Sequence, residues 1–342
     1  MKRLICGLLV LGLCLSGCAL DNAKPETKQY TATFLTLFDT LTTVKGSAES
    51  EEAFSAIAQQ IHDDLEICHQ LFDIYNSYEG IHNLKTVNEM AGKEAVVVDQ
   101  KIIDLLLDCK AYHALTGGKV NAAMGSVLQL WHEARNDSLD RPDKAYLPDM
   151  TALQEAAKHC DIDAVVIDEA ASTVYITDPA VQLDVGAIAK GWAAEFAAQK
   201  APEGFMLSVG GNVRATGPKY ADGTPWVVGV TDPRDANAHL HTLYLTDGSL
   251  VTSGDYQRVY SVDGKPYHHI IDPETLYPSQ YWSSVTIVAQ DSGLADALST
   301  ALFLLPQAEG QELLDLFGAE ALWVDRDGNL YYSPGFKELI RT

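Results

Sequence analysis

The chain has 342 residues, with 47 Asp and Glu against 24 Lys and Arg, and 47% of its residues are hydrophobic. This composition is typical of a globular protein and excludes disorder throughout the chain. The formal net charge of −23 argues against nucleic acid as a partner, because phosphate binding needs a basic surface. A phosphate-bearing ligand would therefore need a local group of cations or a metal ion.

Residues 1–17 have the pattern of an export signal peptide, in which Lys2 and Arg3 precede a short apolar run and then small residues. The run is too short to cross a membrane as a stable helix. The ending at 15–18 (Leu-Ser-Gly-Cys) resembles a bacterial lipobox, which implies lipid, including palmitate, on Cys18 after cleavage. An ordinary signal peptide or an uncleaved anchor is the alternative.

The lipobox resemblance predicts a lipoprotein of the bacterial cell envelope. It would be anchored to the outer face of the cytoplasmic membrane, or to the periplasmic side of an envelope membrane. Residues 18–29 are polar and include Pro25, which indicates a lipidated tether. Folded structure is expected from about Tyr30, so the predicted domain covers 30–342.

The first half of this domain is predicted to be mostly helical. Residues 30–45 are rich in Thr, Phe, Leu and Val, which indicates strand structure broken around Asp39. Apolar residues then recur at helical spacing in four segments, 50–72, 99–115, 123–134 and 151–159.

From residue 164 onward, short β-rich runs predominate. Strands are expected at 164–168, 173–177, 205–209, 226–231, 240–246, 257–262 and 284–290, and helices at 187–200, 293–305 and 308–317. Helices and strands are mixed without regular alternation, which predicts an α+β fold. We expect a single large domain of mixed helices and mostly antiparallel strands, with room for two lobes.

Three cysteines follow Cys18 in the sequence: Cys68, Cys109 and Cys160. Their wide spacing, with no CxxC pair, favours neither a disulfide framework nor a zinc site. Cys68 and Cys109 lie in apolar helical patterns, so buried free thiols are expected there.

The segment 183–192 passes from a strand end through small residues into a helical pattern. Asp184 is placed to cap that helix, and Lys190 adds a cation. Small residues let a ligand approach the backbone, and amides at a helix start favour phosphate. A plain helix N-cap with a solvated lysine is equally compatible with this spacing.

Gly210 and Gly211 follow a strand and precede another β-rich stretch. Such a pair can open a turn toward a ligand, or it can form a bulge between two strands. On this pair alone we favour the bulge.

A third block begins at Ser253-Gly254 and ends in His268-His269-Ile270-Ile271-Asp272-Pro273. The histidines could bind a metal, act as a general base or pack in the core. Because adjacent strand residues point to opposite faces, at most one of them should face a site. Asp272-Pro273 is also a turn signal.

The fourth block, 291–302, has a helical pattern in which Asp296 and Thr300 share one face, four residues apart. A carboxylate and a hydroxyl one turn apart are oxygen ligands of the kind that Mg²⁺ takes. The alternative is a bond from the Thr300 hydroxyl back to the carbonyl oxygen of Asp296.

Several further segments occur in register with these blocks: Phe38-Asp39-Thr40, Asp73-Ile74-Tyr75-Asn76, Val87-Asn88, Val120-Asn121-Ala122-Ala123-Met124-Gly125 and Leu130-Trp131. Together they resemble the bacterial FAD:protein FMN transferases, the ApbE family, whose members are often exported lipoproteins. The resemblance covers nearly all of 30–342, which would be the catalytic domain. It implies an ApbE-like fold related to the T-fold.

The resemblance also implies an activity. Family members transfer FMN from FAD to a threonine hydroxyl of a target flavoprotein, form a phosphoester and release AMP, with Mg²⁺ as cofactor. The acceptor here would be an exported or membrane flavoprotein subunit. Two competing interpretations are an exported Mg²⁺-dependent FAD pyrophosphatase that gives FMN and AMP, and a lipoprotein that binds FAD without turnover.

Carried over by position, the resemblance implies a set of site residues. The Mg²⁺ ligands would be Asp296, Thr300, the Ala187 carbonyl and the nearby Ser299. Residues that contact FAD or line its pocket would be Phe38, Tyr75, Asn121, Ala122, Ala123, Asp184, Lys190, Gly210, Gly211, Ser253, Gly254 and Ile270. His269 is the candidate base or charge-stabilising group, with Asp272 as an alternative base.

Two departures from the family pattern are visible. The family often has Asp-Pro-Thr where this chain has Asn121-Ala122-Ala123, so a carboxylate and a hydroxyl are absent there. Its common Thr-Gly after Asp-Pro is Thr275-Leu276 here. Neither departure changes the Asp296–Thr300 pair, and both affect the contacts expected with the nucleotide.

Overall fold

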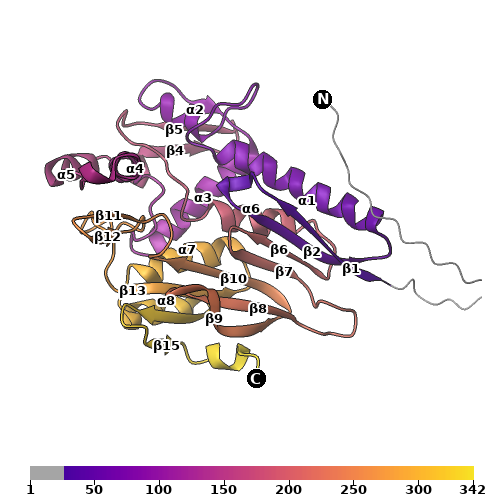
Figure 1. The fold of residues 1–342 in the computed structure, drawn as a ribbon. Helices are drawn as coiled ribbons and strands as arrows, with labels where there is room; N and C mark the ends of the chain where they lie inside the picture. The colour runs from indigo at the N-terminus through magenta and orange to yellow at the C-terminus, as the bar shows by residue number, and fades with distance from the viewer. Residues whose placement is uncertain (1–26) are drawn as a thin grey trace, which may run out of the picture.

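The computed structural model describes residues 27–342 (Figure 1). The predicted signal peptide, the lipid site at Cys18 and the tether up to residue 26 lie outside the described residues. The first strand begins at Lys28, slightly before the expected start near Tyr30. Within the described part of the chain, no helix has the length and apolar character needed to cross a membrane.

An eight-stranded sheet forms the centre of the molecule, and every neighbouring pair of its strands is antiparallel. In spatial order the strands are β1 (Lys28–Phe34), β2 (Thr42–Ala48), β6 (Phe205–Val209), β7 (Asn212–Thr216), β10 (Asp247–Gly254), β13 (Trp282–Ala289), β14 (Glu320–Asp325) and β15 (Leu330–Tyr332).

Helices pack on one face of this sheet, and a β-hairpin covers part of the other (Figure 1). The helices are α1 (Glu51–Phe72), α3 (Gln100–Leu115), α6 (Ala189–Ala198), α7 (Ser292–Phe303) and α8 (Gln307–Phe317), and the hairpin is β8 (Trp226–Asp232) with β9 (Asp235–Leu245). Side chains of strand β14 alternate between the two faces of the sheet. Trp323 packs in the core on the helix side, whereas Leu322 and Val324 pack in the core on the hairpin side.

A second, smaller group of elements lies beside the sheet and its helices. It contains α2 (Leu84–Glu89), α4 (Gly125–Asp140), α5 (Met150–Ala157), the hairpin β11 (Tyr260–Val262) with β12 (Lys265–Tyr267), and a small sheet of β3 (Val96–Val97), β5 (Thr173–Ile176) and β4 (Val165–Asp168). Trp131 of α4 and Leu153 of α5 are buried in a cluster that also includes Tyr260. The result is an α+β single domain, as predicted.

Most predicted elements are confirmed with small shifts. The amphipathic segment after Ser50 forms α1, and the Ser50 hydroxyl accepts a bond from the Ala53 amide as an N-cap. Asp99 caps α3 in the same way through the Lys101 amide. Cys68 and Cys109 are buried free thiols, as expected.

Two local predictions are wrong. Gly210 and Gly211 do not form a bulge but the two-residue turn of the β6–β7 hairpin, because both adopt positive φ (58° and 97°) and the strand residues on either side pair directly. Asp184 does not cap α6, which begins only at Ala189. Its carboxylate instead accepts a bond from the Gly186 amide two residues later.

Candidate active site

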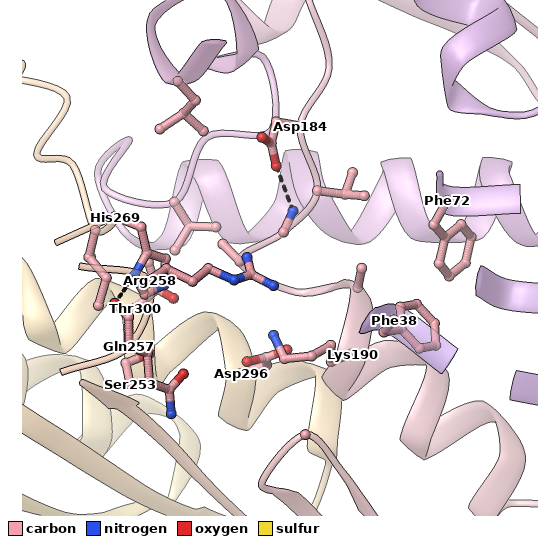
Figure 2. Close-up of a pocket in the computed structure, with 18 of the residues that line it drawn as sticks. Phe38, Phe72, Asp184, Lys190, Ser253, Gln257, Arg258, His269, Asp296 and Thr300 are labelled. Carbon is pink, nitrogen blue, oxygen red and sulfur yellow. Dashed lines mark hydrogen bonds between the residues drawn. The ribbon is translucent and has the colours of Figure 1, made fainter. Parts of the chain in front are cut away.

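A cavity of about 290 Å³ opens where α6, α7 and the end of β10 approach α4 and the segment after α1 (Figure 2). The predicted residues that line it are Phe38, Tyr75, Asn121, Asp184, Ala187, Lys190, Gly210, Ser253, Gly254, His269, Ile270, Asp296 and Thr300. Five predicted residues do not line it: Ala122, Ala123, Gly211, Ser299 and the alternative base Asp272. Segments distant in the sequence therefore converge on one site.

Asp296 and Thr300 are brought together as expected, one turn apart on α7, and both face the cavity. Asp296 is buried, and its Oδ2 accepts a bond from the Gly191 amide at 2.8 Å. A Cβ on Gly191 would overlap the Ser292 carbonyl oxygen and come within 2.5 Å of the Asp296 Cβ. Glycine at 191 thus allows α6 and α7 to approach closely enough for this bond.

Ser299 is fully buried and is not among the residues that line the cavity. It donates to the carbonyl oxygen of Asp296 at 2.8 Å and shares a 2.8 Å hydrogen bond with Ser253 Oγ. Among the described residues, the back-bond considered for Thr300 is therefore made by Ser299 instead. Ser299 orients Ser253 and the helix backbone, and the Thr300 hydroxyl stays at the cavity surface.

The donor set around Asp296 fits a hard divalent cation. Burial raises the pKa of Asp296, although the Lys190 charge and the Gly191 amide act in the opposite direction. A bound cation would add positive charge beside this buried carboxylate and so favour its ionised form. The Thr300 hydroxyl and the backbone at Ala187 add oxygen donors at the same cavity. The buried Asn212 side chain, also at the wall, lies close enough to Asp296 to lower the pKa of that carboxylate by hydrogen bonding.

Three cations line the cavity: Lys119, Lys190 and Arg258. Lys119 Nζ is paired, at 3.1 Å from Asp272 and 2.9 Å from Glu274. Across residues 27–342, neither Lys190 nor Arg258 has a side-chain hydrogen bond or ion pair of its own. In a strongly acidic protein, two such cations in one cavity provide the local positive charge that an anionic ligand needs.

Only one of the two adjacent histidines faces the cavity, as predicted. His269 Nδ1 lies 3.2 Å from the Gln257 carbonyl oxygen, which leaves Nε2 available. Burial, reinforced by the Arg258 charge, lowers the pKa of His269 to about 3, so the imidazole is neutral near pH 7. His268 is buried and bonded to the Ser279 carbonyl oxygen at 2.8 Å.

Asp272 has a structural role. Its carboxylate accepts a bond from the Glu274 amide at 3.0 Å and pairs with Lys119, and it is not among the cavity-lining residues. The turn signal at Asp272-Pro273 is confirmed. As a candidate base, Asp272 is therefore less well placed than His269.

Aromatic side chains stand at the cavity wall. The Tyr75 side chain is largely exposed, at 62%, and its hydroxyl lies 3.0 Å from His132 Nδ1. The Asp73 carboxylate fixes the Tyr75 backbone, because it accepts a hydrogen bond from the Tyr75 amide at 2.6 Å. Phe38 adopts a left-handed conformation (φ 52°) and packs edge-on against His69. Such rings can stack on a planar heterocycle.

Residues 121–123 support the wall through the backbone. Asn121 Oδ1 accepts from the Ala123 amide at 2.9 Å, and its Nδ2 donates to the Cys160 carbonyl oxygen at 2.8 Å. Ala122 and Ala123 are buried behind the cavity surface, where the Ala122 carbonyl oxygen accepts from the Asp184 amide at 2.8 Å. Asn121 itself reaches the cavity.

The cavity-lining residues that the sequence did not predict include Asn212, Arg258 and His132. Asn212 directly follows the glycine turn, so recognising that turn as a hairpin would have placed it opposite Val209. Arg258 and His132 reach the cavity only through the packing of distant elements, and no local pattern identifies them.

A cavity lined by three cations, a neutral histidine, the Asp296–Thr300 pair and aromatic rings is the arrangement of an enzyme that binds a phosphate-bearing aromatic ligand. The chain belongs to the ApbE family, whose model matches residues 38–323.

Curated relatives include an FAD:protein FMN transferase of Treponema pallidum, 36% identical over 278 residues (76% of this chain, 75% of that one). Another, of Klebsiella pneumoniae, is 30% identical over 73% of this chain and 78% of its own. The solved structure of the ApbE protein of Thermotoga maritima is 32% identical and has a TM-score of 0.79, over 92% of this chain and all of that one. These relatives agree with the resemblance found from the sequence motifs.

Proposed function

We propose that this chain is an FAD:protein FMN transferase that moves FMN from FAD to a threonine hydroxyl of a target flavoprotein and releases AMP. The observation that carries the proposal is the cavity in which Lys190 and His269 lie with the Asp296–Thr300 pair, beside exposed aromatic rings. Relatives that carry this enzyme name support it.

The reaction balances without any oxidant or reductant. The threonine oxygen forms a bond to the phosphorus of the FMN half, and the bond from that phosphorus to the bridging oxygen breaks. The bridging oxygen leaves with AMP, and the hydroxyl proton passes to a base. The chain offers no cysteine in a reactive motif: burial raises the pKa values of the Cys68, Cys109 and Cys160 thiols. We therefore infer direct transfer without a covalent enzyme intermediate.

Lys190 and the proposed metal site would neutralise the negative charge of the diphosphate. Lys190, which pairs with no acid among the described residues, is placed to neutralise phosphate oxygens. Asp296, Thr300 and the Ala187 carbonyl would hold Mg²⁺, which when bound neutralises phosphate charge and orients the diphosphate for displacement.

His269 is the proposed proton acceptor. Its Nδ1 is engaged with the Gln257 carbonyl, so Nε2 is the nitrogen that can take the hydroxyl proton. The pKa of about 3 makes the ring a weak base by itself. The negative charge of a bound diphosphate would raise that pKa and improve His269 as an acceptor.

Asp184 and the aromatic residues would hold the two ring systems of FAD. Tyr75 and Phe38 offer ring faces, and the carboxylate of Asp184 also lines the cavity. Glycine at 210 lets the turn that lines the cavity pack closely against Thr40, since a Cβ there would come within 2.8 Å of that side chain.

The proposal is tested by incubating the protein with FAD, Mg²⁺ and a purified flavoprotein subunit that bears a candidate threonine. Mass spectrometry should find an FMN-sized gain on that threonine and AMP in equal amount. A subunit with threonine replaced by alanine is the control and should gain nothing. Free FMN and AMP without a modified subunit would identify a pyrophosphatase, and unchanged FAD would identify a binder.

We also propose that the chain is exported and lipidated at Cys18, with palmitate among its acyl groups. The support is the sequence pattern of residues 1–18 alone. Metabolic labelling with palmitate should mark the wild-type protein in the membrane fraction. Cys18→Ala should lose the label and leave the membrane, and retention of label would contradict lipidation at this residue.

A further inference from the structure

Arg258 is placed at the cavity by the segment between β10 and β11. Its side chain extends from the His269 side of the cavity toward the region of Lys190 and Asp296 (Figure 2). The preceding carbonyl, that of Gln257, is the partner of His269 Nδ1. Arg258 has a φ of 47°, a left-handed conformation that is uncommon for residues other than glycine.

Three other arginines in the described part of this acidic chain are paired with carboxylates, and Arg135 and Arg326 bond to side-chain amide oxygens. Arg214 Nε lies 2.7 Å from Glu195, and Arg234 Nη2 lies 2.9 Å from Asp232. Arg141 and Asp137 form a further pair at 3.5 Å. Arg258 differs, because in the described part of the chain its guanidinium forms no ion pair and no hydrogen bond. All its donors are therefore available to a ligand.

The Arg258 charge acts on three other residues that line the cavity. It lowers the pKa of His269, and it acts in the same direction on Tyr75 and on His132 of α4. An anionic ligand in this cavity would therefore lie within reach of the same positive charge.

From these observations we propose that Arg258 is a further catalytic residue, whose guanidinium grips non-bridging oxygens of the FAD diphosphate and stabilises the charge that develops on the departing AMP phosphate. The inference rests on the proposed function. The planar guanidinium can bind two phosphate oxygens at once, which an ammonium group cannot do. Lys190 and Arg258 would then approach the diphosphate from the α6 side and from the β10–β11 segment.

The test compares wild type with Arg258→Ala, Arg258→Lys and Arg234→Ala, an exposed arginine of the β8–β9 hairpin, as matched control. Wild type must first convert FAD, either to modified acceptor or to FMN and AMP. If it does not, the proposed function fails, independently of Arg258. With active wild type, Arg258→Ala should lower kcat at least about 100-fold, as loss of one charge-stabilising donor does. Arg234→Ala should leave kcat unchanged.

Rescue of activity by guanidinium ion in solution distinguishes a catalytic role of Arg258 from a merely structural one. Guanidinium ion should restore part of the activity of Arg258→Ala, and it should not increase the activity of wild type. Arg258→Lys should stay at least about 10-fold below wild type, because it keeps the charge but not the two-pronged geometry. Circular dichroism and FAD binding confirm that each variant is folded.

Three results would overturn the proposal. The first is a kcat of Arg258→Ala within about threefold of wild type. The second is a rise in KM for FAD with kcat unchanged, which indicates binding without preference for the transition state. The third is full activity of Arg258→Lys.

Discussion

The two walls of the cavity differ in how the fold holds them. The sheet wall, which we define as Gly191, Ser253, Asp296 and Thr300, comes from regular helices and strands and is tied by buried hydrogen bonds. The loop wall, defined as Phe38, 73–76 and Arg258, comes from turns: Tyr75 is 62% exposed, and Phe38 and Arg258 have positive φ. The comparison indicates that the proposed cation site lies on the rigid wall, whereas Arg258 and the aromatic rings approach the ligand from the wall built of turns.

The largest expected effect comes from the carboxylate of the sheet wall. Asp296→Ala should lower the transfer rate about 1,000-fold, because it removes the only carboxylate of the proposed cation site. Asp315→Ala, an exposed aspartate of α8, is the matched control and should be as active as wild type. The measurement is AMP release under saturating FAD. Near wild-type rates of AMP release in Asp296→Ala would show that the sheet wall has no part in the mechanism.

The second effect concerns the glycine that lets α6 meet α7. Gly191→Ala should lower the free energy of unfolding by about 1–3 kcal/mol, because its Cβ would overlap the Ser292 carbonyl oxygen. It should also weaken the amide bond to Asp296. Urea unfolding measures the first consequence and the Mg²⁺ dependence of turnover the second. An unchanged unfolding midpoint would show that the two helices separate easily, contrary to a rigid wall.

A smaller effect is expected on the loop wall. Tyr75→Ala should raise KM for FAD about 10-fold through loss of ring stacking, and Tyr75→Phe should stay within about threefold of wild type. Tyr281→Ala, a similarly exposed tyrosine outside the cavity, provides the control. Equal KM values for the alanine and phenylalanine variants would assign the role to the hydroxyl and its His132 contact instead.

The smallest effect is a pH dependence of stability at His269. Its pKa is lowered from 6.5 to about 3, so between these values the unfolded chain binds a proton that the folded chain does not. Stability from this group is present above about pH 6.5 and is lost as the pH falls toward 3. His269→Gln should therefore lose less stability than wild type between pH 7 and pH 5 in thermal unfolding. Parallel losses would show that His269 titrates normally.

The sequence predicted the sheet wall well because its key features are local. The spacing of Asp296 and Thr300 requires only that 292–303 be a helix, and Ser50 and Asp99 are caps that act within one turn. Strand β7 and the strands β14 and β15 escaped prediction, since they are short runs whose pairing is decided by neighbours distant in the chain.

The errors have the same origin. Asp184 looked like a helix cap because it precedes small residues, but Val185–Ile188 form turns first and the helix begins one turn later. Thr300 and Ser299 compete for the same carbonyl, and only the structure shows that Ser299 bonds to it. Arg258 reaches the cavity through the packing of β10–β11 against His269, which no local pattern encodes.

The most direct measurement is a crystal structure of the protein with FAD and Mn²⁺ in place of Mg²⁺, whose anomalous signal locates the metal. The account predicts a metal bound by Asp296 Oδ1 and the Thr300 hydroxyl, a diphosphate held between Lys190 and Arg258, and a ring of FAD on Tyr75. A metal bound elsewhere, or a diphosphate away from these two cations, would contradict it.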